Sequence, residues 1–223
     1  MVTISNIRRR TAVLAAAVAV LAAACGGDTG TANDAPTGPE RPSPLPVIVD
    51  YSPTVSDAGA LLYLASHPDV DLVAVTLAGT GESRCEVGVP NTIGLLALAG
   101  KADVPVACGP TEPIGPGHEW PAEWRDAADA LFPLEFDPTA AGDARSAVDL
   151  LIDIAAATEG VVMVALGPLT NLAAAIEQQP AFADDVAMLY SMGGAIGAAG
   201  NAPNGAEWNY YVDPTAVAVV LRS

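Results

Sequence analysis

From residue 47 onward the chain alternates short β-branched apolar runs with longer runs of helical spacing. Residues 109–143 interrupt this alternation with six prolines and two of the three tryptophans, and they are predicted to be loop. Strands that alternate with helices are typical of βαβ units, so we expect an α/β domain with a mainly parallel sheet flanked by helices. The predicted strands are 47–49, 72–77, 104–107, 161–165 and 186–191, and the predicted helices are 57–66, 89–99, 144–157, 171–178 and 214–221.

The first 24 residues have the pattern of an export signal. A basic segment, 1–10, precedes an apolar run, 11–24, that is too short to span a bilayer but suits a signal-peptide core. The run ends in Ala22-Ala23-Ala24-Cys25, which resembles a bacterial lipobox, although Leu21 stands one place early. The resemblance implies cleavage before Cys25 and lipidation of its thiol. An ordinary secretory signal with an incidental cysteine is the alternative.

Residues 25–46 then provide the lipidated cysteine and a linker rich in Gly, Pro, Thr and Asp, a composition typical of a flexible tether. Several acyl chains hold a protein on a membrane, whereas one chain alone is marginal. We therefore expect a lipid anchor on the extracytoplasmic face of the cell membrane, with the folded domain in residues 47–223.

The charge of the chain excludes one class of partner. The formal net charge is -17, and three of the nine basic residues, Arg8, Arg9 and Arg10, lie in the export signal. So acidic a domain repels phosphate backbones, which argues against nucleic-acid binding. Solubility is the simplest interpretation of the acidity.

Two further cysteines, Cys85 and Cys108, would reach an oxidising compartment after export. There they can form a disulfide, or they can remain as two buried thiols.

Polar residues follow the predicted strands, where ligands of parallel sheets bind. Asp50 closes the first strand, and Asp57 stands at the start of the next helix. An acid at a helix N-terminus is stabilised by the helix dipole, which explains Asp57 structurally. Carboxylates on such a loop can also hold a hard cation such as Ca²⁺.

Four segments in order resemble the inosine-uridine-preferring nucleoside hydrolases. They are VDYSPTVSDA (49–58), TLAGT (76–80), ALGPLTNLA (165–173) and MGGAIGAAGNAPNGAEWNYYVDPTA (192–216). The first resembles the family's opening motif, DxDxxxDD, and the last resembles its pattern MGG…GN…AE(F/W)N…DP.A. The resemblance implies a Rossmann-like nucleoside-hydrolase fold. It also implies an activity, hydrolysis of the N-glycosidic bond of ribonucleosides, which gives base and ribose.

The resemblance also implies a site. In the family a Ca²⁺ binds the ribose hydroxyls and the attacking water, and the second Asp of the motif is regarded as the base. The matching positions make Asp50, Asp57 and the carbonyl of Leu166 candidate metal ligands. Residues Asn201, Glu207 and Asn209 match the family's sugar-binding residues. His118, Trp120 and Trp124 can line the pocket, or they can be a solvated loop histidine and a cover for the core.

This chain departs from the family pattern at several of these positions. Ser52 occupies the base position and Ser56 replaces another acid, while Thr80 replaces an Asn. A serine cannot serve as a carboxylate ligand or as a base near neutral pH. The family's late Asp ligand and late His would lie beyond Ser223, so the domain is expected to be incomplete at its C-terminal side. We therefore expect a weakened calcium site.

Three hypotheses follow for the function. The chain is a nucleoside hydrolase lipoprotein with weak or lost activity, a non-catalytic nucleoside- or ribose-binding lipoprotein, or a truncated pseudoenzyme. The expected small-molecule partner is a nucleoside or ribose in each functional case. The residues indicate neither a base preference nor an oligomeric state.

The export signal generates the first prediction. Labelled lipid should enter the wild-type protein through Cys25, and Cys25→Ala should release or trap the protein, because the acyl chains are lost. Metabolic lipid labelling and membrane fractionation measure both effects. The anchor would be excluded if the wild type takes up no lipid label and if the wild type and Cys25→Ala are retained on the membrane to the same extent.

Overall fold

The computed structural model describes residues 43–130 and 136–223, and these belong to one compact unit. The predicted signal peptide, Cys25 and nearly all of the linker lie outside the described residues. No described helix is long and apolar enough to cross a membrane.

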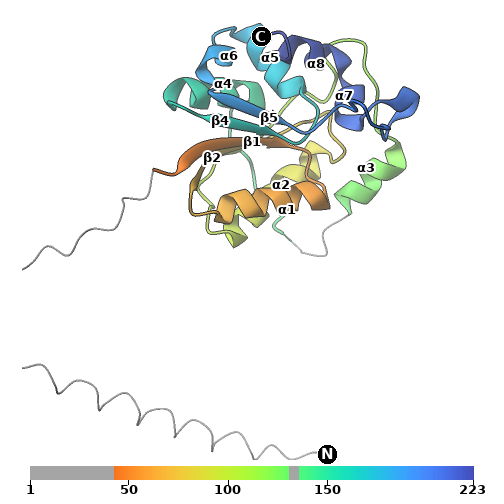
Figure 1. The fold of residues 1–223 in the computed structure, drawn as a ribbon. Helices are drawn as coiled ribbons and strands as arrows, with labels where there is room; N and C mark the ends of the chain where they lie inside the picture. The colour runs from red at the N-terminus through yellow and green to blue at the C-terminus, as the bar shows by residue number, and fades with distance from the viewer. Residues whose placement is uncertain (1–42, 131–135) are drawn as a thin grey trace, which may run out of the picture. The chain divides into compact units, whose positions relative to one another are not determined.

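Five parallel strands form a single sheet in the order β3-β2-β1-β4-β5. The predicted α/β fold with a parallel sheet is therefore confirmed (Figure 1). The strands are β1 (Leu45–Tyr51), β2 (Val70–Leu77), β3 (Val106–Cys108), β4 (Val162–Ala165) and β5 (Met188–Ser191). β1 lies at the centre, between β2 and β4, and its residues from Val47 to Tyr51 are buried.

Helices cover both faces of the sheet, as the buried runs of the sequence require. Ile48 and Met163 pack on one face with α4 (Ala147–Ala157), α5 (Thr170–Gln178) and α8 (Pro214–Val220). Val49 and Val75 pack on the other face with α1 (Val55–Ser66) and α2 (Cys85–Leu98). The short helices α6 (Phe182–Asp185) and α7 (Trp208–Val212) and the 3-10 turn η1 (Pro203–Gly205) complete this part of the chain.

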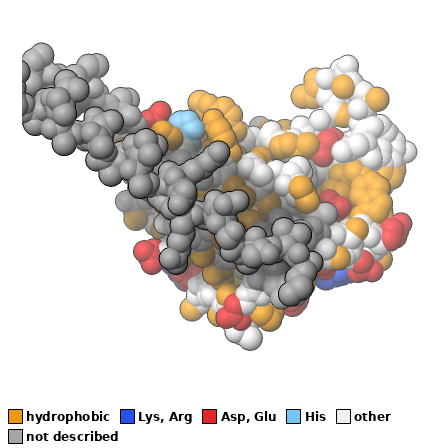
Figure 2. Space-filling view, turned by 90° about the horizontal axis from the view of Figure 1, so that it is seen from below, with side chains coloured by type: hydrophobic (Ala, Val, Ile, Leu, Met, Phe, Trp, Pro, Cys, Tyr) orange, Lys and Arg blue, Asp and Glu red, His pale blue; other side chains and the backbone are white. Residues whose placement is uncertain are grey.

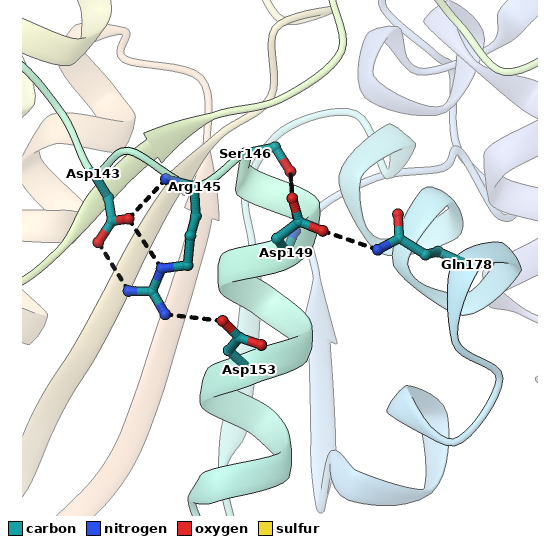
Figure 3. A network of polar contacts seen from close by, with 6 residues as sticks. All are labelled: Asp143, Arg145, Ser146, Asp149, Asp153 and Gln178. Carbon is teal, nitrogen blue, oxygen red and sulfur yellow. Dashed lines mark hydrogen bonds and ion pairs between the residues drawn. The ribbon is translucent and has the colours of Figure 1, made fainter.

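The first turn of α4 shows how polar residues fix a helix. Ser146 is its N-cap and accepts a hydrogen bond from the backbone N–H of Asp149, which satisfies one of the free donors of that turn. The carboxylate of Asp149 in turn accepts a hydrogen bond from Gln178 of α5, at 2.9 Å. Beside it, Arg145 pairs with Asp143 and Asp153 (Figure 3). These partly exposed contacts orient α4 against α5 and add little stability.

One stretch that the sequence predicted to be loop contains a helix, α3 (Ala122–Asp129). The prolines of 109–143 suggested irregular structure, but all of them lie outside 122–129, a segment of good helix formers that Pro121 precedes. Asp129 then holds this helix to the loop after β2, because its carboxylate accepts hydrogen bonds from the backbone N–H of Arg84 and from the Ser83 hydroxyl. Figure 1 shows α3 and α7 at the end of the sheet where the strands finish.

A disulfide joins Cys85, the first residue of α2, to Cys108, the last residue of β3. Their Cα atoms are 5.9 Å apart, a separation that a bridge spans without backbone movement. The bridge therefore fastens the start of α2 to the edge of the sheet.

The second prediction concerns this bridge. Cys85→Ser with Cys108→Ser should lower the free energy of unfolding by roughly 3 kcal/mol, because closing a loop of this length restricts the unfolded chain. Denaturant unfolding measures the change, and thiol counting on exported, denatured and unreduced protein tests the bridge directly. Two free thiols in the wild-type domain would refute it.

Candidate functional site

A cavity of about 220 Å³ opens at the carboxyl ends of the strands. Ligands bind at this edge in open α/β sheets. The loop after β1, the loop after β2, the loop after β4 and the segment that leads into α7 all contribute to it. Its lining comprises Ser52, Thr54, Ser56, Asp57, Glu82, Trp120, Trp124, Leu166, Met192, Asn201, Glu207, Trp208 and Asn209.

Asp50 lies beneath the cavity and is absent from its lining. Its carboxylate Oδ1 accepts hydrogen bonds from the Thr76 hydroxyl and from the side-chain amide of Asn171, both at 2.6 Å. Burial raises the pKa of Asp50 to about 7, although these two hydrogen bonds lower it. Asp50 therefore joins β1, β2 and α5. Its backbone carbonyl accepts a hydrogen bond of 2.7 Å from the N–H of Leu166, another candidate metal ligand, but unlike Leu166 and Asp57 it does not line the cavity.

Ser52 lies at the floor of the cavity and is 2% exposed. Its Oγ accepts hydrogen bonds from the backbone N–H groups of Glu82, at 2.7 Å, and Ser83, at 3.3 Å. The hydroxyl therefore fixes the loop after β2 against the loop after β1. Gly81 makes this approach possible, because a Cβ at that position would lie 2.6 Å from Ser52 Oγ.

Asp57 stands in the first turn of α1, where Thr54 is the N-cap. The Ser56 hydroxyl donates a hydrogen bond of 3.3 Å to its carboxylate. Burial raises the pKa of Asp57 to about 7, and the nearby charge of Glu82 raises it further, against the hydrogen bonds. Burial also raises the pKa of Glu82. Two carboxylates that influence each other thus share this cavity.

The segment before α7 supplies the opposite wall. Glu207 is the N-cap of α7, and its carboxylate accepts hydrogen bonds from the backbone N–H groups of Asn209 and Gly194, both at 3.1 Å. Asn201 Oδ1 accepts the backbone N–H of Trp208. Asn209 Nδ2 donates to the carbonyls of Leu166 and Met192. The three predicted sugar-binding residues therefore do lie together, and internal hydrogen bonds hold each in place.

Part of their hydrogen-bonding capacity remains available to a ligand. Within the described ranges, neither Asn201 Nδ2 nor Asn209 Oδ1 has a hydrogen-bond partner, so one donor and one acceptor remain beside the carboxylate of Glu207. Hydroxyl groups both donate and accept, and a pair of adjacent sugar hydroxyls suits such a set.

Three tryptophans form an aromatic wall beside these polar groups. Trp120 stacks on Trp208 with ring centroids 4.8 Å apart and 19° between the planes. Trp124 lies 5.5 Å from Trp208 at an inclined angle. All three line the cavity. Trp208 was not singled out from the sequence, although the wall depends on it.

His118 lies elsewhere. It is exposed and stacks on Tyr211, with ring centroids 3.8 Å apart, and it borders a different hollow. The solvated-loop interpretation of this histidine agrees with the structure.

The ligand set for calcium is sparse. Of the three candidate ligands only Asp57 and Leu166 reach the cavity, and the Leu166 carbonyl already accepts a hydrogen bond from Asn209. Within residues 43–130 and 136–223, no three histidine, cysteine or acidic side chains are grouped so that they could hold a metal ion. Ca²⁺ takes six to eight oxygens, so these residues do not fit a tight calcium site.

Residues 47–223 match the model of the family described as inosine-uridine preferring nucleoside hydrolase. The chain belongs to this family. It is 35% identical over 185 residues to a probable uridine nucleosidase 2 of Oryza sativa subsp. japonica, covering 82% of this chain and 55% of the relative. It is 31% identical over 180 residues to the pyrimidine-specific ribonucleoside hydrolase RihA of Escherichia coli O81 (strain ED1a), covering 80% and 57%.

Solved structures of the family agree with the fold. The plant nucleoside hydrolase PpNRh1 superposes with a TM-score of 0.72 at 34% identity, covering 79% of this chain and 56% of that one. The inosine-uridine preferring nucleoside hydrolase of Bacillus anthracis gives a TM-score of 0.69 at 28% identity, covering 79% and 61%. The chain thus spans little more than half the length of the relatives it matches.

The third prediction concerns Asp50. The folded state keeps its proton up to about pH 7, whereas the unfolded chain releases it near pH 3.8. Because the folded state binds more protons between these values, its stability should fall as the pH rises from about 4 to about 7. Asp50→Asn preserves the acceptor for Thr76 and Asn171 and removes this dependence. It should therefore melt higher than the wild type at pH 8, and the difference should shrink at pH 5.

Thermal melts across this pH range measure the effect. The control is Asp71→Asn, a change at an exposed carboxylate of β2, which should leave the pH dependence as it is in the wild type. Two results would contradict a protonated Asp50 in the folded state. One is a wild-type stability that does not change between pH 5 and 8, and the other is an Asp50→Asn protein that is less stable than the wild type at pH 8.

Proposed function

We propose that this chain hydrolyses the N-glycosidic bond of ribonucleosides, slowly, as an exported lipoprotein. The observation that carries the proposal is the single cavity that unites Asn201, Glu207 and Asn209 with Asp57 and the tryptophan wall. Family membership supports the substrate class, since the matched relatives are named as uridine nucleosidases and as a pyrimidine-specific ribonucleoside hydrolase. The resulting products are a free base and ribose.

The cavity has two chemically different sides that suit the two halves of a nucleoside. The carboxylate and amide groups offer hydrogen bonds to sugar hydroxyls, while Trp120, Trp124 and Trp208 offer apolar surface and aromatic faces to a planar base. A base that stacks on this wall would also exclude water from one side of the glycosidic bond. The acidic surface does not repel such a ligand, because a nucleoside carries no phosphate.

The carboxylates of the cavity suit the reaction itself. Cleavage of a glycosidic bond passes through a state in which the sugar ring resembles an oxocarbenium ion. Asp57 and Glu207 lie on opposite walls and place negative charge around the sugar site. Charge that is already fixed in the protein stabilises a cation that develops during the reaction.

Calcium is the cofactor that the family implies, and its binding here should be weak. Asp57 and the Leu166 carbonyl are two of the oxygens it would need, and a bound ion would activate water and bind sugar hydroxyls. Hydrogen bonding to the sugar hydroxyls, stacking on the base and stabilisation of the sugar cation by these side chains do not require the ion.

Location follows from the export signal. Cys25 would hold the domain at the extracytoplasmic face of the cell membrane through its lipid, and the linker would allow the cavity to reach solutes outside the cell. The disulfide at Cys85 supports this location, because such bonds persist in oxidising compartments.

Binding without turnover is the second candidate function. It is favoured by one observation, the presence of Ser52 where the family has its base. Ser52 is occupied with two backbone N–H groups and cannot take a proton from water near neutral pH.

The fourth prediction separates these functions. Wild-type protein should hydrolyse inosine or uridine slowly, and Ser52→Asp should raise the rate by up to about 10²-fold, the lower end of what a general base contributes. Asp57→Ala should abolish turnover. Chromatography of the released base measures the rate of hydrolysis. Quenching of tryptophan fluorescence measures nucleoside binding independently.

Nucleoside binding with no base release from either the wild type or Ser52→Asp would establish the binding protein. A protein that neither binds nor hydrolyses nucleosides would reject both functions. Fast wild-type turnover would show that the loss of the acid at position 52 is fully compensated.

A further inference from the structure

Glu82 stands out among the residues of the cavity, because the family resemblance assigned no role to it. It follows β2 by five residues, in the loop that Ser52 fixes, and it lines the same cavity as Asp57 and Glu207. The charge of Glu82 also contributes to raising the pKa of Asp57, which lines the same cavity.

The loop that carries Glu82 is fixed on both sides of that residue. The backbone N–H of Glu82 donates to Ser52 Oγ at 2.7 Å. The next residue, Ser83, donates from its hydroxyl to Asp129 at 3.0 Å, and the backbone N–H of Arg84 donates to the same carboxylate at 2.9 Å. A carboxylate on a loop held in this way keeps a defined position, as catalysis requires.

We propose that Glu82 supplies the carboxylate that the opening loop lacks at Ser52, and that it is the general base of this site. The inference rests on the proposed hydrolysis. Ser52 does not perform the chemistry itself. Instead it holds the backbone of Glu82, so that the acid reaches the cavity from the neighbouring loop rather than from β1.

The step balances without a metal ion. A water molecule in the cavity gives its proton to the carboxylate of Glu82 as its oxygen bonds to C1′ of the sugar. The C1′–N bond breaks, its electron pair leaves with the base, and the base takes a proton from solvent. The carboxyl groups of Asp57 and Glu207, which line the same cavity, stabilise the positive charge of the sugar ring. Glu82 then returns its proton to solvent.

The fifth prediction compares two matched variants of the wild-type chain. Glu82→Gln keeps the size of the side chain and the backbone bond to Ser52 but removes the base. Its kcat for inosine or uridine should fall about 10²-fold or more, because general-base catalysis contributes ~10²–10⁴-fold. Nucleoside binding, measured by tryptophan fluorescence, should stay within a few-fold of the wild type. Glu86→Gln, four residues further on at an exposed position of α2, should behave as the wild type.

A second arm asks whether Glu82 replaces the acid missing at position 52. In the Ser52→Asp background, Glu82→Gln should cost much less activity than it costs in the wild type, since a carboxylate is again present. A role limited to holding the loop would give equal losses in both backgrounds.

The outcomes are distinguishable from those of the proposed function. If the wild type hydrolyses nucleosides and Glu82→Gln does so at a similar rate, the role of Glu82 is refuted and the hydrolase stands. If Glu82→Gln loses nucleoside binding or thermal stability together with activity, its role is structural and the inference also fails. If the wild type and Ser52→Asp both release no base, the proposed hydrolysis and this inference fail together.

Discussion

The buried carboxylate of Asp50 is the interaction on which the site depends. Its Oδ1 accepts hydrogen bonds from Thr76 on β2 and from Asn171 on α5, and its own strand is the centre of the sheet. Asn171 also donates to the carbonyl of Leu77, the last residue of β2. Three elements that are remote in sequence therefore meet at one fixed point, where β1 and β2 end and α5 begins. The loops that leave those elements can form a cavity because their starting positions are fixed relative to one another.

Above that point the walls are held by backbone N–H groups bonded to side-chain oxygens. Ser52 binds the loop after β2, Asp129 binds the same loop to α3, and Glu207 binds the start of α7. A helix start or a tight loop presents several unpaired N–H groups. Ser52 and Glu207 each accept at least two of them, and Asp129 accepts one together with the Ser83 hydroxyl. The polar residues around the cavity consequently have structural partners and unused hydrogen-bonding capacity at the same time. Figure 2 shows acidic side chains scattered over the face that it presents.

The fold was predictable because hydrophobic periodicity is local. The run that contains Val49 is apolar and β-branched, and such a run becomes a buried strand whatever surrounds it. The helix α3 was missed because the prolines on either side of residues 122–129 suggested loop. Its attachment through Asp129 joins segments about 45 residues apart, which no local pattern indicates. The family motif predicted that Asn201, Glu207 and Asn209 act at one site, and the structure places all three in one cavity. Their binding of sugar stays a prediction. Motif matching did not indicate Glu82, because its place in the cavity comes from the loop that Ser52 holds, and it did not show that Asp50 is fully buried outside the cavity lining.

Ser52 replaces the second acid of the family motif, but other acidic side chains still line the cavity. Asp57, Glu82 and Glu207 still line the space beside the tryptophan wall, and a nucleoside, the proposed substrate, carries no charge that they would repel. A ribose that loses its base becomes positive, and negative side chains fixed by backbone hydrogen bonds stabilise that state more than they stabilise the neutral nucleoside. A bound cation would add activation of water, but it would also offset part of this negative field. Within the described residues the acids of this cavity are not grouped so that three of them could hold a metal ion, so their charge is better matched to the sugar of the proposed substrate than to a metal.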